Sequence, residues 1–185
     1  MIIKLKKNYL FVDQFKLKCC VGKAGIKRNK IEGDKSTPFG FYKLGKLYIR
    51  KDRNKNIDTK LFKIFIKKNM GWCNDSRSNY YNNLIKIHKK TNFRYEKLYR
   101  NDYKYDLLIP ILYNSNKVKK WKGSAIFIHL TKNYKKTLGC VALKKKDMLI
   151  LLKLINKDSR ELAIKLCHEY GILIKDCSSL SKYLQ

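Results

Sequence analysis

Short apolar runs, separated by charged or turn-forming segments, dominate this sequence and predict a fold made mainly of β-strands. Near the N-terminus, apolar residues recur with a period of two at Phe15, Leu17, Cys19 and Val21. Two further apolar runs, 105–113 and 124–130, are bounded by turn residues and predict central strands. Thirteen tyrosines and eight phenylalanines also favour strands over a helical bundle.

The helical signals lie toward the C-terminus. Apolar residues recur at helical spacing, with Asp147 early in the segment, at Met148, Leu149, Leu151, Leu152 and Ile155. A second helix is predicted over 161–169, ending before Gly171, and a last strand over 172–174. With 185 residues, the sequence predicts one domain, 1–185, mainly β with short helices mostly toward the C-terminus.

The chain carries 44 Lys and Arg against 14 Asp and Glu, a formal net charge of +30. One interpretation is a polyanionic partner such as nucleic acid, anionic lipid or a cell-wall polymer. The other is compositional drift, because lysine, asparagine, isoleucine and tyrosine are all abundant and the lysines are spread along the whole chain. We favour the second interpretation. Arginine, which reads phosphate and guanine bidentately, is scarce, so no specific nucleic-acid partner is expected.

The cysteines and histidines lack the spacing of a metal site. The three histidines show no zinc-finger spacing and no CxxC pair occurs among Cys19, Cys20, Cys73, Cys140, Cys167 and Cys177. We therefore expect no metal, and a domain of this length does not need disulfides. No window is long and apolar enough for a transmembrane segment. Charges also interrupt every candidate secretory signal, so the sequence as written predicts a cytoplasmic location.

The segment 125–143 contains the strongest chemical signal. It reads AIFIHLTKNYKKTLGCVAL, with His129 ending one apolar run and Cys140 opening the next. The lysine-rich loop between them would fold the imidazole back toward the thiol, which is the minimum equipment for a cysteine nucleophile. Gly139 permits a sharp turn, and the N–H groups of Leu138, Gly139 and Cys140 could stabilise an oxyanion. With no carboxylate in the segment, a backbone carbonyl is expected to orient His129. The alternative is a buried cysteine and a strand histidine that never meet.

Several linked motifs resemble the L,D-transpeptidase catalytic domain (the YkuD-like family). Members carry a histidine, then a short loop and Ser/Thr-x-Gly-Cys, matched here by His129 and by Thr137 to Cys140. An upstream Thr-Pro-x-Gly followed by an aromatic strand is matched at 37–41. The stretches 71–75 and 96–107 resemble the branch of the family that lacks a peptidoglycan-binding module. The resemblance is strongest over 21–152.

This resemblance implies a β-sandwich or mixed sheet in which Cys140 is the nucleophile and His129 the general base, with Gly139 and Thr137 completing the motif. The family transfers an acyl group on peptidoglycan stem peptides, through a thioester, to an amine of a second stem, giving a 3→3 crosslink. It uses no cofactor, and its substrate implies the periplasm or cell wall. Two alternatives stay open: hydrolysis of the same bond by an L,D-carboxypeptidase or amidase, and a basic polyanion-binding module whose active site has decayed.

Some residues around the motif bear on substrate binding. Many members place an arginine two residues after the nucleophile, where this chain has Ala142, so an anionic substrate group needs another contact, from a lysine or from Arg100. Substrate-binding candidates are Trp72, Asp75, Arg100 and Thr37. The related branch commonly has a second histidine before its Glu-x-Leu run, where this chain has Tyr95.

Overall fold

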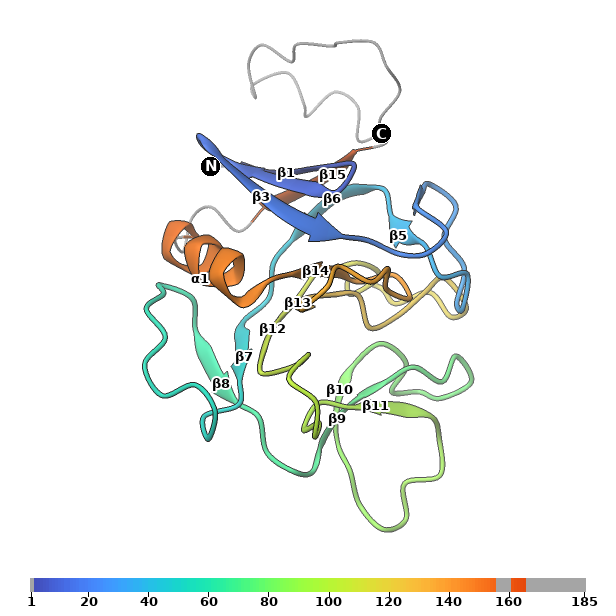
Figure 1. Ribbon diagram of the computed structural model, residues 1–185. Coiled ribbons are helices and arrows are strands. Elements are labelled where there is room, and N and C mark those ends of the chain that lie inside the picture. Colours follow the sequence, from blue (N-terminus) through green and yellow to red (C-terminus); the bar gives the residue numbers. More distant parts are fainter. Residues whose placement is uncertain (1, 156–160, 166–185) are drawn as a thin grey trace.

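Strands dominate the protein, whose computed structural model describes residues 2–155 and 161–165 (Figure 1). The largest sheet has ten strands in the spatial order β6 (Gly40–Lys43), β15 (Glu161–Lys165), β1 (Ile2–Lys6), β2 (Tyr9–Val12), β3 (Phe15–Cys20), β14 (Val141–Leu143), β13 (Phe127–Leu130), β12 (Leu107–Pro110), β7 (Leu47–Ile49) and β8 (Lys63–Phe65). Three of its neighbouring pairs, β1 with β15, β13 with β14 and β7 with β8, are parallel. The sheet is therefore mixed, and the prediction of a mainly β fold is confirmed.

Smaller elements flank this sheet. A three-stranded antiparallel sheet has the order β10 (Leu84–Lys86), β9 (Met70–Cys73) and β11 (Tyr95–Lys97), and β4 (Ile26–Lys27) pairs with β5 (Thr37–Pro38). The helix of the described chain is α1 (Lys145–Leu154), which follows β14 directly. In Figure 1, α1 and the three-stranded sheet lie on different sides of the central strands β12 to β14.

The alternation of side chains along β13 and β14 divides the core in two. Ile128 and Val141 belong to the larger apolar cluster, which also contains Met148 and Leu151 of α1. Phe127 and Cys140 belong to a second cluster. Trp72, Leu98 and Tyr105 pack into this second cluster from the three-stranded sheet and the segment after it. Successive residues along a strand face opposite sides, so one face packs on the larger cluster and the other, with the candidate nucleophile, packs on the second cluster.

One prediction about the elements needs correction. The helix predicted over 161–169 is wrong for 161–165, which form β15 and pair with β1 on one side and β6 on the other. The remainder of that segment, and the strand predicted over 172–174, lie outside the described residues. Strand β9 also contributes to the layer on the second cluster, because Met70 and Trp72 pack against it.

The cysteines of the described chain are reduced. Cys19, Cys20, Cys73 and Cys140 are free and buried, while Cys167 and Cys177 lie outside the described residues. Over residues 2–155 and 161–165, no helix is long and apolar enough to cross a membrane.

Candidate active site

His129 and Cys140 come together through the parallel pairing of β13 with β14. His129 lies opposite Ala142, and Cys140 comes just before β14. The N–H of Phe127 donates to the Cys140 Sγ at 3.4 Å, which confirms that these two residues lie side by side. Because alternate residues of a strand share a face, the imidazole and the thiol emerge on the same face, offset by roughly 7 Å along the strands. The two side chains are thus neighbours on the second cluster's side of the sheet.

The surroundings of His129 suit it to accept a proton. Its Nδ1 lies 3.0 Å from the carbonyl O of Leu130, so the backbone carbonyl expected as its orienting partner is present. In the tautomer in which Nδ1–H donates to this carbonyl, Nε2 is left as the free base. The Tyr105 ring packs edge-on against the imidazole, with ring centroids 5.4 Å apart. Burial lowers the pKa of His129 to about 4, and the nearby Lys104 and Arg100 lower it too, so the ring is neutral at pH 7.

The Cys140 thiol is also neutral at rest. Its Sγ donates to the carbonyl O of Ala125 at 3.4 Å, and only 9% of the residue is exposed. Burial raises the pKa of Cys140 to about 12, and the negative charge of Glu96 raises it further. A buried pair shifted in these opposite directions favours thiol and imidazole over thiolate and imidazolium.

A tight turn from Thr137 to Cys140 holds the sulfur in place. The Thr137 hydroxyl accepts from the N–H of Gly139 at 3.1 Å and donates to the carbonyl O of Cys140 at 2.6 Å. The N–H of Gly139, predicted to face an oxyanion, is thus engaged by Thr137. The N–H groups of Leu138 and Cys140 remain as the oxyanion candidates. Thr137 therefore shapes the turn that carries the sulfur.

Thr37 supports this turn from behind. Its side chain is fully buried, and its Oγ1 donates to the carbonyl O of Gly139 at 2.8 Å while accepting from the N–H of Gly22 at 2.9 Å. The Thr-Pro motif is therefore joined to the nucleophile turn by a hydrogen bond across 102 residues. These contacts make Thr37 a positioning residue, and because its only hydroxyl proton is donated to Gly139, it cannot donate to a substrate.

Replacing Thr37 with valine is expected to lower the free energy of unfolding by about 2 kcal/mol, because one buried N–H and one buried carbonyl lose their partner. Thr37→Ser keeps the hydroxyl and is the matched control, with an expected loss of about 1 kcal/mol or less for the missing methyl group. Urea denaturation of the two variants measures the difference. Equal losses would show that the hydroxyl's hydrogen bonds add little.

The remaining predicted substrate residues divide into two groups. Trp72 lines the site: its ring meets Phe127 edge-on at 5.2 Å, and its Nε1 donates to Asn82, which also accepts from the N–H of Ala125. Asp75 accepts instead from the backbone N–H groups of Arg77 and Arg94, and so it holds these two segments together. Trp72 therefore lies beside the site, whereas Asp75 has a structural role.

Arg100 lies near His129, but its positive charge is already paired with Asp102. It makes a two-pronged contact with Asp102, Nε to Oδ1 at 3.0 Å and Nη2 to Oδ2 at 2.7 Å. Its guanidinium also lies over the ring of Tyr105, 5.1 Å from the centroid. Tyr105 and Glu96 are the site neighbours that sequence reasoning missed: the Tyr105 hydroxyl donates to Glu96, and its ring contacts both Phe127 and His129.

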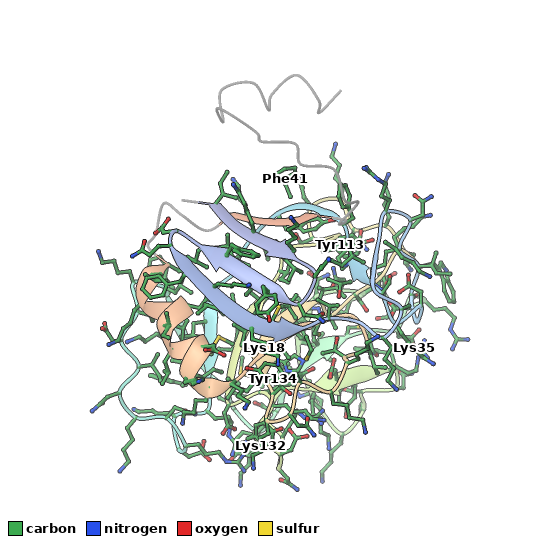
Figure 2. The ribbon with its side chains drawn as sticks, turned by 45° about the horizontal axis from the view of Figure 1, so that its top comes forward. Lys18, Lys35, Phe41, Tyr113, Lys132 and Tyr134 are labelled. Carbon is green, nitrogen blue, oxygen red and sulfur yellow. The ribbon has the colours of Figure 1, made fainter. Side chains whose placement is uncertain are left out.

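The loop between His129 and Cys140 is anchored to the body of the protein. The Tyr134 hydroxyl donates to Asp147 of α1 at 3.2 Å, and the Nζ of Lys18 lies 4.9 Å from the centre of the Tyr134 ring. Figure 2 shows Lys18 and Tyr134 close together, with Lys132 farther along the same loop. This anchoring fixes the path by which the loop returns to Cys140.

A basic hollow borders the end of β13, directly after His129. Its volume is about 470 Å³, and it is lined by Tyr103, Asp106, Leu130, Thr131, Lys132, Lys144, Lys145 and Lys146. Four lysines make this hollow suitable for an anionic group. Within residues 2–155 and 161–165, no cluster of three or more His, Cys, Asp or Glu side chains is arranged to hold a metal ion.

Comparisons with known proteins point to one family. The family model described as the YkuD L,D-transpeptidase catalytic domain matches residues 2–162. Among solved structures, the chain is similar to the helical cell shape determining protein Pgp2 from Campylobacter jejuni, with 19% identity over 91% of this chain and 48% of that one, at a TM-score of 0.46. A point mutant of the same protein gives 19% identity, 91% and 47% coverage and a TM-score of 0.45. The chain spans about half the length of these structures. No curated protein matches it.

Proposed function

Since the chain belongs to the L,D-transpeptidase catalytic domain family, we propose that it is a cysteine-dependent acyltransferase acting on peptidoglycan stem peptides. The observation that carries this proposal is the pairing of β13 with β14, which makes His129 and Cys140 neighbours on one face of the sheet. The turn from Thr137 to Cys140, supported by Thr37, gives the sulfur a fixed backbone setting. These features match the chemistry of acyl transfer, which needs a thiol, a base and nearby N–H donors.

The first half of the proposed reaction forms a thioester. Nε2 of His129 takes the proton of the Cys140 thiol as the sulfur attacks the carbonyl carbon of the third residue of the donor stem. The N–H groups of Leu138 and Cys140 stabilise the negative oxygen of the tetrahedral intermediate. The C–N bond to the terminal D-alanine then breaks, and the imidazolium returns its proton to the leaving amine.

The second half transfers the acyl group. An amine of a second stem attacks the thioester carbonyl, His129 accepts a proton from that amine, and the sulfur leaves as the amide bond forms. The thiol regains its proton from the imidazolium, which completes the cycle. Water in place of the amine would give hydrolysis, so the presence of an acceptor decides between crosslinking and carboxypeptidase activity.

Ala142 stands where many relatives carry an arginine, and another part of the protein can supply the lost contact with the substrate. An arginine at this position in many relatives can bind a substrate carboxylate, whereas Ala142 is fully buried opposite His129. The hollow lined by Lys132 and Lys144 to Lys146 also includes Leu130 and Thr131, the two residues that follow His129 in the chain. We assign the binding of a stem-peptide carboxylate to this hollow, since lysine ammonium groups are strong partners for anions.

Mass spectrometry of the protein incubated with a tetrapeptide stem or a carbapenem tests the proposal. We expect a covalent adduct that peptide mapping assigns to Cys140, and the same adduct on Cys20→Ala, whose cysteine lies in the adjacent strand β3. Product analysis with and without an acceptor amine then separates transfer from hydrolysis. A folded protein that forms no adduct, yet binds polyanions in a salt-dependent way, would favour the decayed binding module instead.

A further inference from the structure

Glu96 lies next to residues that line the candidate active site. Glu96 lies directly opposite Trp72 in the pairing of β11 with β9, and residues opposite one another in an antiparallel pair share a face. Trp72 packs on Phe127, whose N–H donates to the sulfur of Cys140. The Tyr105 hydroxyl, which donates to Glu96, belongs to the ring that packs on His129. Glu96 is therefore connected to the base through Tyr105, and it shares a face with Trp72, which packs beside the nucleophile.

No cation of the described chain is committed to this carboxylate. Its closest ion-pair contact is Nη1 of Arg100 at 3.9 Å, and that guanidinium is already engaged by both oxygens of Asp102. Some acidic side chains are paired much more closely, with Asp34 at 2.6 Å from Lys30 and Asp52 at 2.7 Å from Arg50. The main hydrogen-bond partner of the Glu96 carboxylate is the neutral hydroxyl of Tyr105, although the chain has 44 basic residues.

This arrangement has a cost that a bound cation would remove. Burial raises the pKa of Glu96, so its ionised form is disfavoured where it stands. Its negative charge also raises the pKa of the Cys140 thiol and so opposes formation of the attacking thiolate. A positive charge beside Glu96 would offset both effects. The side chain is 28% exposed, which leaves it accessible to a ligand in the site.

We propose that Glu96 is a specificity-determining residue that receives an alkylammonium group of the substrate, next to the acyl-transfer centre. The proposal rests on the proposed function: by the family resemblance, the third residue of the donor stem is a diamino acid, and the acceptor brings an amine. Both groups are primary ammonium ions at neutral pH, and a carboxylate is their natural partner. Binding of this ammonium group brings the missing cation to the site together with the scissile carbonyl.

The test compares a tetrapeptide stem that has a free side-chain amino group with the same peptide acetylated at that group. Calorimetric binding to Cys140→Ala is expected to favour the free amine by about 10-fold or more, a difference typical of one charge-assisted hydrogen bond. The double variant Cys140→Ala/Glu96→Gln should bind both peptides equally. Cys140→Ala/Tyr105→Phe keeps the carboxylate and should retain the preference. Thermal unfolding checks that each variant is folded. If Glu96→Gln does not fold, Glu96→Asp, which keeps the negative charge, is measured in its place.

Two outcomes would overturn the proposal: equal binding of the two peptides by Cys140→Ala, or a preference that survives Glu96→Gln. Both readouts are independent of turnover, so a protein that shows the amine preference but forms no acyl-enzyme would refute the proposed function and leave the role of Glu96 standing. The source of the ammonium group is separated kinetically in a Cys140-containing protein. A higher KM for donor hydrolysis in Glu96→Gln assigns it to the donor, and a lower ratio of transfer to hydrolysis assigns it to the acceptor.

Discussion

Replacing His129 with glutamine is expected to lower kcat/KM for acyl transfer by about 10³-fold, the loss typical of removing a general base. Both partners of the pair are neutral at rest, because burial raises the pKa of Cys140 to about 12 and lowers that of His129 to about 4. The thiol therefore has no other route to deprotonation as strong as the imidazole. Glutamine has a similar size and no charge, so the fold should be retained. Steady-state kinetics with a stem-peptide donor measure the effect.

The matched control is His88→Gln, since His88 is exposed and lies in the turn after β10, away from the site. It should leave kcat/KM unchanged within about twofold, as expected for a surface substitution. A comparable loss in both variants, or no loss in His129→Gln, would contradict the role of His129 as base.

The pH profile of the same reaction distinguishes a neutral pair from an ion pair. His129 is competent as a base only when unprotonated, so kcat/KM should fall as pH drops through its lowered pKa of about 4. Above that pH the ring stays neutral, and the rate should be level from about pH 5 to about pH 8. A resting thiolate–imidazolium pair would instead lose activity at alkaline pH, when the imidazolium deprotonates. A decline of kcat/KM as the pH rises through about 7 would therefore refute the neutral pair.

The fold was predictable wherever a local pattern agreed with the tertiary packing. The spacing of Met148, Leu151 and Leu152 identifies α1, and all three are fully buried against the sheet. The segment 161–165 shows the opposite case. Its sequence, ELAIK, fits an alternating strand as well as a turn of helix, and its pairing on both sides, with β1 and β6, decides for the strand. Pairing partners so distant in the chain leave no signal in the segment itself.

The site was predictable to the extent that it follows one continuous segment. Two apolar runs joined by a polar loop predict neighbouring strands, and β13 and β14 are indeed paired. Glu96 lies in β11 and Tyr105 in the segment before β12, and the order of motifs does not reveal that the Tyr105 ring packs on Phe127 while its hydroxyl donates to Glu96. The contact of Thr37 with Gly139 was equally hidden: the motif marks Thr37, but only the fold shows that its hydroxyl faces the backbone of the turn.

Replacing Gly139 with alanine is expected to destabilise the protein by about 3–4 kcal/mol and to abolish activity. Two costs add at this position. The φ of +145° is a conformation that residues with a Cβ rarely adopt, at about 1–2 kcal/mol. A Cβ would also lie 2.8 Å from the carbonyl O of Ser36 and 3.1 Å from Cδ1 of Ile126, and such an overlap with backbone costs about 2 kcal/mol more. Relieving it moves the turn that holds Cys140.

Comparison of Gly139→Ala with Gly33→Ala isolates the cost of the steric overlap. Gly33 also has a positive φ, +79°, but an added Cβ there meets nothing within 4 Å, so its expected loss is about 1 kcal/mol. Chemical denaturation of the two variants gives the difference, and adduct formation with a carbapenem reports on the site. We expect Gly33→Ala to form the adduct and Gly139→Ala not to, even at temperatures where it stays folded. If both variants lost the same stability and both reacted, the close approach of Ser36 to the turn would not be what positions the sulfur, and the geometric basis of the proposed nucleophile would be wrong.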